Sequence, residues 1–235
     1  MFTDPDKAAV MVNSMSALCS ALTIFFLYLT IVFLVKRVVA PKREGEGGTE
    51  EYSPGQAIAI YGSGAVGALA YCFSDTFWFS AVEGEVYAMS SLFTAMVVWA
   101  MTKWYEETDR RYANRWIVLI SFLMGLSIGV HLLNLLAIPM LVYMYYFKMR
   151  EDKPYSFWEY VKIMAVSVVI LAFILFFMVP YIPKIAAYFD LFFVNTLGLP
   201  YNTGAAFFIV ALLTACFWGL FKEPDVPVIR AVHPR

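Results

Sequence analysis

The stretch SMSALCSALTIFFLYLTIVFLV, residues 14–35, decides the fold class because it contains no charged side chain. About 20 apolar residues in a helix are enough to cross the roughly 30 Å hydrocarbon core of a bilayer. A second uncharged run of similar length, IMAVSVVILAFILFFMVPYIP, occupies residues 163–183. The sequence therefore predicts an integral membrane protein rather than a soluble domain.

The composition agrees with a membrane protein. Hydrophobic residues make up 61% of the 235-residue chain, charged residues 15%, and the mean hydropathy is +0.69. A soluble domain averages about 45–50% apolar and about 25% charged residues. The net charge is −1 and no basic stripe is present, so the sequence gives no indication of a nucleic-acid partner. The three cysteines lie far apart in apolar runs and are interpreted as small buried hydrophobic residues.

The distribution of lysine and arginine predicts how the chain crosses the membrane. Seven hydrophobic elements can be marked, at about 14–35, 56–74, 86–102, 116–130, 132–147, 160–180 and 204–221. Seven crossings with the N-terminus outside place fifteen basic residues on the cytoplasmic side and two on the outer side. If residues 116–147 formed a single helix, the split would be nine to eight. The positive-inside rule thus favours two short helices joined by a tight outer turn near residues 129–134.

These observations define the expected architecture. We expect an all-α polytopic bundle of about seven transmembrane helices over residues 1–221, followed by a short cytoplasmic tail over residues 222–235. A loop over residues 181–203 would return to the outer side.

Two acidic residues stand out in FWFSAVEGEVYAMSSLF, residues 77–93, because Glu83 and Glu85 have no lysine or arginine near them in the sequence. The predicted topology places them on the outer side. An ionisable residue at a membrane boundary is a candidate functional group. Two structural alternatives stay open: both acids could be solvated loop residues, and Glu83 could place a favourable negative charge at the start of the 86–102 helix.

The same outer side gathers the other candidate residues. Aromatic side chains next to the acids could form an interfacial belt and also a platform for a sugar or a lipid. The predicted catalytic residues are Glu83 and Glu85, and the predicted substrate-binding residues are Asp75, Tyr87, His131, Asn134 and Asn195.

The stretch QAIAIYGSGAVGALAYCF, residues 56–73, contains the G-x-G-x-x-G pattern of dinucleotide-binding folds. We reject that interpretation because a soluble α/β fold cannot accommodate the other runs of transmembrane length. The glycines are better explained as a small-residue stripe that lets membrane helices pack closely. The expected stripe consists of Gly62, Ser63, Gly67 and Ala70.

Three stretches resemble a known family: residues 73–104, FSDTFWFSAVEGEVYAMSSLFTAMVVWAMTKW; residues 115–139, RWIVLISFLMGLSIGVHLLNLLAIP; and residues 192–204, FFVNTLGLPYNTG. They resemble a bacterial family of unknown function, DUF2723, which is related to the protein O-mannosyltransferases and to the GT-C class of membrane glycosyltransferases. The resemblance runs to about residue 221. It implies a GT-C-like bundle, a polyprenyl-phosphate-linked sugar donor, and transfer to a protein or glycan acceptor on the outer face of the bacterial inner membrane.

The chain departs from that family at both ends. Family members begin with another transmembrane helix and a long outer loop, where GT-C enzymes usually keep their catalytic carboxylate. The start of this chain, MFTDPDKAAVMVNSMSALCSA, resembles the region just after that loop, and the end, EPDVPVIRAVHPR, does not resemble the family's continuation. From the resemblance we expect a truncated member with little transfer activity of its own.

Three functions compete at this point. A glycosyltransferase module needs a carboxylate to deprotonate the acceptor hydroxyl, with or without a divalent metal ion to steady the phosphate leaving group. The first alternative is a non-catalytic membrane subunit or a remnant. The second is a transporter for a lipid or a small solute, but a transporter would be expected to show acidic residues near mid-membrane and an internal repeat, and the sequence shows neither.

Overall fold

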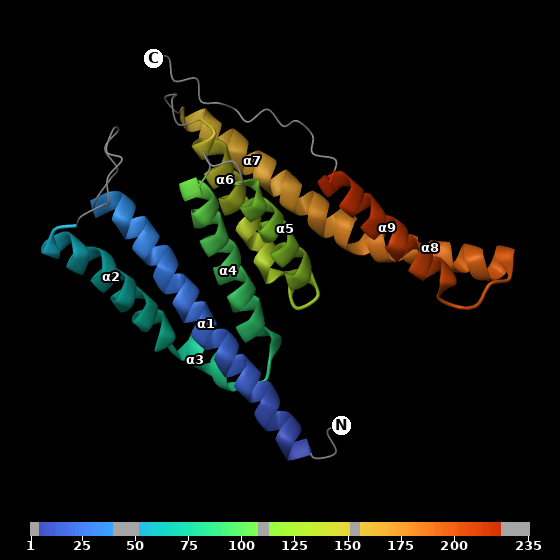
Figure 1. Cartoon of the computed structure of the whole chain (residues 1–235), viewed down its shortest axis with the longest axis horizontal. Coiled ribbons are helices and arrows are strands. Elements are labelled where there is room, and N and C mark those ends of the chain that lie inside the picture. Colours follow the sequence, from blue (N-terminus) through green and yellow to red (C-terminus); the bar gives the residue numbers. More distant parts are fainter. Residues whose placement is uncertain (1–4, 40–51, 108–112, 151–155, 222–235) are drawn as a thin grey trace. The chain divides into compact units, whose positions relative to one another are not determined.

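The structure is a computed structural model that describes residues 5–39, 52–107, 113–150 and 156–221, and every regular element within them is helical (Figure 1). The expected all-α class is therefore confirmed for these residues. The chain divides into two compact units, Met1–Leu171 and Ala172–Arg235, which are described separately below.

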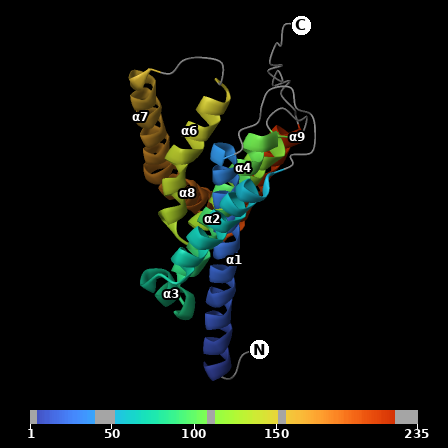
Figure 2. The same cartoon turned by 90° about the vertical axis from the view of Figure 1, so that its left-hand side faces the viewer.

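The first unit begins with three long helices and one short helix. These are α1 (Pro5–Val39), α2 (Pro54–Cys72), α3 (Asp75–Val82) and α4 (Val86–Glu107). Helix α1 packs along both α2 and α4, and α3 lies against α1 (Figures 1 and 2). The side-chain amide of Gln56, at the start of α2, donates to the Val39 carbonyl at the end of α1, with N···O 3.4 Å. The rings of Phe33 and Tyr105, late in α1 and late in α4, lie 6.2 Å apart. Thus α2 runs antiparallel to α1, and α4 runs parallel to it.

The next part of the first unit is a helical hairpin. Its elements are α5 (Asn114–Ile128), the 3-10 helix η1 (Leu132–Ala137) and α6 (Ile138–Lys148). At one end of α5, the Trp116 indole N–H donates to the Glu107 carboxylate at 3.0 Å. Just after its other end, the His131 ring lies 5.5 Å from the Tyr87 ring at the start of α4. Helix α5 therefore runs antiparallel to α4, and the chain reverses near His131, as the charge distribution predicted.

Local chemistry explains why residues 116–147 do not form one continuous helix. His131 has an extended backbone, with φ −163° and ψ 143°, and its ring nitrogen Nδ1 accepts a hydrogen bond from the Leu133 N–H at 3.1 Å. This side-chain cap opens the 3-10 helix η1. Pro139 lies in the first turn of α6, where its missing N–H costs no intrahelical hydrogen bond.

The end of the described chain differs from expectation. Helix α7 (Phe157–Phe173), the π-helical turn η2 (Ile174–Met178) and α8 (Val179–Leu197) form one helical segment of 41 residues. At 1.5 Å per residue this segment is about 60 Å long, roughly twice the hydrocarbon core. The outer loop expected at 181–203 is therefore wrong for most of its length, because α8 continues to Leu197.

Two features keep this segment helical and then end it. A π-helical turn precedes Pro180, which lies in the first turn of α8, so its missing N–H is accommodated where the hydrogen-bond pattern shifts. At the end of α8, Gly198 takes the left-handed conformation, with φ +65°, which is common for a glycine that terminates a helix. The chain then turns back into α9 (Thr203–Phe221), which packs against α8 in the second unit.

The length and composition of the described helices support the classification as a membrane protein. By length and composition, two can cross a bilayer, Lys7–Val39 and Phe157–Leu197. A third candidate is the pair α2 and α3, which is bent by 66°. Shorter apolar helices cover Asn114–Ile128, Leu132–Lys148 and Thr203–Ala215. Seven crossings therefore stay a prediction.

Two glycines allow α1 and α2 to approach each other closely. A Cβ atom built on Gly64 would lie 2.6 Å from Cγ2 of Val32, and one built on Gly67 would lie 2.8 Å from Cδ1 of Ile31. Real side chains do not approach so closely, so a larger residue at either position would force Val32, Ile31 or the helices themselves to shift. The interface is a small-residue contact of the kind that membrane helices use.

The stripe expected from the sequence is only partly correct. Gly67 packs on α1, but a Cβ atom on Gly62 would meet nothing within 4 Å, and Ser63 and Ala70 are exposed. The face of α2 that packs on α1 follows the spacing i, i+4, i+7, i+8 of an amphipathic helix. Its members are Ile60, Gly64, Gly67 and Ala68.

These two environments give a matched test. We expect Gly64→Ala to lower the free energy of unfolding by roughly 1–3 kcal/mol, because the new methyl group overlaps Val32. Gly62→Ala should leave stability unchanged or raise it by up to about 1 kcal/mol, because alanine favours the helix and meets open space. Unfolding of the purified chain in mixed micelles, followed by circular dichroism, measures both. Equal stability of the two variants would contradict the packing described here.

Candidate functional site

A cavity of about 590 Å³ lies between α1, α2, α4 and η1 in the first unit. Seven of its thirteen lining residues carry a hydroxyl group: Thr23, Thr30, Tyr71, Tyr87, Ser90, Ser91 and Thr94. The remaining lining residues are apolar, among them Leu27, Ile31 and Val98. Cavities of this size are typical of small-molecule sites. Inside a membrane bundle, a hydroxyl-rich lining can receive polar groups that lipid chains cannot solvate.

The threonines of the cavity use their protons within their own helices. Thr23 Oγ1 donates to the Cys19 carbonyl at 2.8 Å, and Thr94 Oγ1 donates to the Ser90 carbonyl at 3.0 Å. Thr30 does the same with the Phe26 carbonyl at 2.9 Å. Each threonine oxygen can still accept a hydrogen bond from a ligand. Most of the cavity surface is nevertheless apolar, so the cavity suits a ligand that combines an apolar part with a few hydroxyl donors.

Tyr87 links the cavity to the η1 turn. It lines the cavity from the first turn of α4, and its ring contacts the half-buried His131 ring with 5.5 Å between centroids and an interplanar angle of 50°. Since His131 Nδ1 accepts the Leu133 N–H, the neutral imidazole carries its proton on Nε2. His131 can thus present an N–H donor beside Tyr87. The structure brings together these two residues from the predicted set.

The acidic loop lies against the first turns of α1. A Cβ atom on Gly84 would lie 2.8 Å from Cγ1 of Val12 and 3.0 Å from Oδ1 of Asn13, so a larger residue would force these side chains or the loop to shift. The flanking Glu83 and Glu85 are both exposed. Because Gly84 holds the loop against α1, the two carboxylates are presented at the end of the bundle where α4 begins.

The two acids have different local positions. Glu83 closes α3, and its backbone N–H donates to the Phe79 carbonyl at 3.1 Å. Glu85 immediately precedes Val86, the first residue of α4. Glu85 therefore lies closer to the start of the 86–102 helix than Glu83, and a helix-dipole role for Glu83 stays a prediction. A carboxylate at the start of a helix is stabilised by the helix dipole.

Asn134 supports the turn through one side-chain atom, while its Oδ1 has no hydrogen-bond partner among the described residues. It is fully buried, and its side-chain Nδ2 donates to Ser127 Oγ at 2.9 Å. Ser127 Oγ in turn donates to the Met124 carbonyl at 2.7 Å. This buried chain of hydrogen bonds ties η1, which begins just after His131, to α5. Ser127 is not among the residues predicted from the sequence, although its spacing of seven residues from Asn134 across the turn is a usable signal.

Two further predicted residues, Asp75 and Asn195, are exposed on other helices. Asp75 is exposed in the first turn of α3. Asn195 is exposed on α8, in the second unit. Within the described ranges, no three His, Cys, Asp or Glu side chains are grouped closely enough to hold a metal ion. The residues described do not fit a divalent metal site, so no chemical step is assigned to one.

Asp190, which the predicted topology placed in an outer loop, has a structural role. Its side chain is 8% exposed, and its carboxylate oxygens accept the backbone N–H groups of Asn202 at 3.3 Å, Gly204 at 3.1 Å and Ala205 at 3.4 Å. These donors lie at or just before the first turn of α9, so Asp190 caps α9 from the neighbouring helix α8.

This cap can be tested against a neighbour on the same helix. We expect Asp190→Ala to destabilise the α8–α9 hairpin by about 1–2 kcal/mol, the usual scale for losing a helix cap. Asn195→Ala, which removes an exposed side chain, should change stability by less than about 0.5 kcal/mol. Protease susceptibility of residues 198–202 in detergent reports on the hairpin. Identical digestion of both variants would rule out the capping role.

The comparison with protein families covers the part of the chain that holds this site. Residues 1–154 match the family described as the protein O-mannosyl-transferase TMEM260 N-terminal domain. No match was found among curated proteins or among solved structures. The matched residues contain the hydroxyl-lined cavity, the acidic loop and the Tyr87–His131 pair, whereas the third stretch that carried the resemblance, 192–204, lies outside them. The chain belongs to the protein O-mannosyl-transferase TMEM260 N-terminal domain family.

Proposed function

We propose that this chain is a membrane glycosyltransferase module that moves a sugar from a polyprenyl-phosphate donor to a hydroxyl acceptor, such as a protein serine or threonine. The observation that carries the proposal is the cavity with hydroxyl groups in its lining, which Tyr87 borders. The Tyr87 ring contacts His131, and Tyr87 follows the exposed Glu83 and Glu85 by a few residues in the sequence. Family membership supports the same class of reaction.

The cavity suits the sugar end of such a donor. Threonine and serine oxygens can accept hydrogen bonds from sugar hydroxyl groups, while Leu27, Ile31 and Val98 offer an apolar wall to the first isoprene units. The donor phosphate would lie near the Nε2–H of His131 and the backbone N–H groups in the first turn of α4, since a helix N-terminus favours an anion.

The chemistry assigned to this arrangement is an inverting displacement. Glu85 accepts the proton of the acceptor hydroxyl while the hydroxyl oxygen attacks C1 of the sugar. The bond between C1 and the phosphate oxygen breaks, and polyprenyl phosphate leaves with the bonding electron pair. The His131 N–H stabilises the negative charge that develops on the phosphate.

The two ends of the first unit support transfer on the extracytoplasmic side. The acidic loop and the η1 turn share one end, as the contacts of Gly84 with α1 and of His131 with Tyr87 indicate. Basic residues collect at the other end of α1, α4 and α6: Lys36, Arg37, Lys103 and Lys148. The positive-inside rule assigns the basic end to the cytoplasm.

The first functional prediction concerns the base. Glu85→Gln should lower the rate of transfer at least about a hundredfold, because glutamine keeps the shape but cannot accept the proton. Glu83→Gln should lower it less than about tenfold, since Glu83 closes α3 and lies farther from α4. The assay uses polyprenyl-phosphate mannose and a serine- and threonine-rich peptide with membranes that carry a full-length relative, with each substitution made at the matching glutamate. A normal rate for Glu85→Gln would contradict the assignment of the base.

The second functional prediction concerns the cavity. Ala95 lines it, and Ala95→Phe should raise KM for the donor at least about tenfold with little change in kcat, because the new ring fills the binding space. Ala70→Phe, on an exposed face of α2, is the matched control and should leave both constants unchanged. Equal effects at both positions, or no binding of polyprenyl-phosphate mannose to the unaltered chain, would remove the cavity from the proposal.

A further inference from the structure

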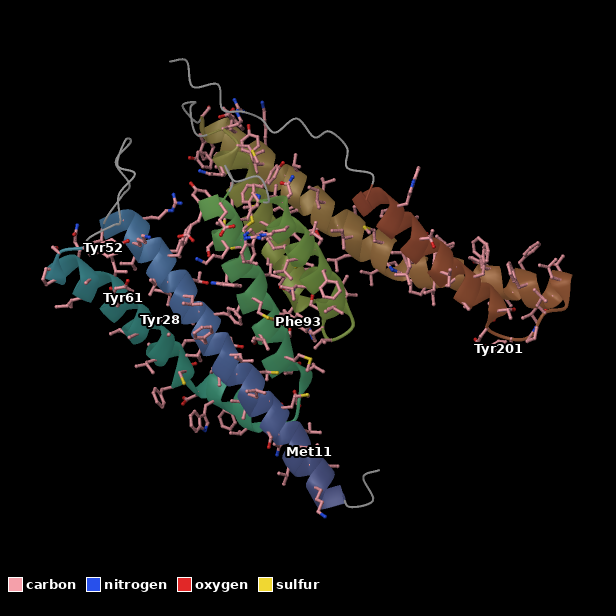
Figure 3. All side chains as sticks on the ribbon, viewed as in Figure 1. Met11, Tyr28, Tyr52, Tyr61, Phe93 and Tyr201 are labelled. Atoms are coloured by element: carbon pink, nitrogen blue, oxygen red, sulfur yellow. The ribbon has the colours of Figure 1, made fainter. Side chains whose placement is uncertain are left out.

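A second cavity, of about 370 Å³, lies between α1, α2 and α4 at the end of the first unit opposite His131. Its outer part is formed by Lys36, Tyr52 and Lys103, and its deeper part by apolar residues that include Leu29 and Ile60. Tyr61, on α2, also lines it and is 49% exposed, so the cavity wall reaches the lateral surface of the helices. Figure 3 shows Tyr52 and Tyr61 beside α1.

The cavity changes from basic to apolar along the helix axis. On α1, Leu29 and Lys36 both line it and are seven residues apart, which corresponds to about 10 Å of helix rise. On α4, Trp99 lies one turn before Lys103. The two helices are parallel, so both place lysine at the outer level and apolar or aromatic side chains below it. A ligand that fits this gradient has an anionic head and an apolar body.

Positive charge predominates at this level of the first unit. The Lys36 ammonium lies 5.8 Å from the centroid of the Tyr52 ring. Arg37 and Lys148 lie 4.2 Å and 4.8 Å from the centroid of the Tyr105 ring, one from α1 and one from the end of α6. The acid of the cavity, Glu106, pairs with Lys103 at 2.8 Å. The cavity is thus lined by one carboxylate and two lysines, with two further cations nearby, so the described residues at this level include more cations than acids.

We propose that this second cavity binds the phosphate headgroup of an anionic glycerophospholipid. Lys36 and Lys103 contact the phosphate, Tyr52 and Tyr61 flank the glycerol region, and the start of an acyl chain lies against Leu29 and Ile60. Basic pockets between membrane helices recognise anionic lipids by this combination of charge and apolar surface. The apolar floor distinguishes a lipid from a soluble phosphate compound. The site is separate from the transfer site, so neither proposal depends on the other.

Fluorescence quenching tests the site because Trp99 lines the cavity. The purified chain in non-ionic detergent is titrated with brominated phosphatidylglycerol or with brominated phosphatidylcholine. We expect phosphatidylglycerol to quench with an apparent Kd at least about fivefold lower than that of phosphatidylcholine. Trp99→Phe should remove the selective part of the quenching. A chain without preference between the two lipids would overturn the proposal.

Matched variants separate the site from general charge effects. Lys36→Gln/Lys103→Gln should abolish the preference for phosphatidylglycerol. Lys36→Arg/Lys103→Arg should retain it, because arginine keeps the positive charge, and this variant shows whether substitution at these two positions disturbs the fold. Lys7→Gln/Lys184→Gln makes the same change of net charge elsewhere in the chain and should retain the preference. Loss of the preference in this control would overturn the proposal. Full displacement of the lipid by millimolar inorganic phosphate would also overturn it, in favour of a soluble phosphate ligand.

Discussion

The packing of α4 on all sides is the constraint on which the first unit depends. This helix contacts α1, α3, α5, η1 and α6. Its side chains Val97, Ala100, Met101 and Trp104 are almost completely buried. In a bilayer, lipid chains are as apolar as these residues, so the helix is held by close packing rather than by exclusion of water. Because α4 starts beside the acidic loop and ends among the basic residues, it also fixes both candidate sites relative to each other.

Charge was the most informative sequence signal, and hydrophobic length was less so. The reversal at His131 was predicted correctly because a continuous helix over 116–147 would have removed the asymmetry of basic residues. The prolongation of the helix through Pro180 and Pro183 was not predicted, because prolines usually mark helix ends. A π-helical turn just before Pro180 changes the hydrogen-bond pattern locally, and nothing in the residue types announces it.

The candidate site was predictable where it depends on charge and hidden where it depends on hydroxyl groups. Glu83, Glu85 and His131 stand out from an apolar background, whereas serines and threonines inside apolar helices are common and carry little signal one at a time. Their spacing carries more: Thr23 and Thr30 are two helical turns apart on α1, and Ser90 and Thr94 are one turn apart on α4. Because α1 and α4 are in contact, the hydroxyl groups of both helices line the same cavity.

The separation of charge along the first unit connects the two sites physically. The transfer reaction needs a carboxylate at the acidic end to accept the acceptor proton, and the N–H donor of His131 offsets the negative charge that develops on the leaving phosphate. An anchoring site gains from lysines that keep their heads at the membrane surface while their stems cover apolar helix faces. Both needs are met if acids and bases occupy opposite ends of the same helices. Glu85 directly precedes α4, and Lys103 lies near the other end of that helix. The polarity that orients the protein in the membrane is thus also the polarity that its proposed chemistry requires.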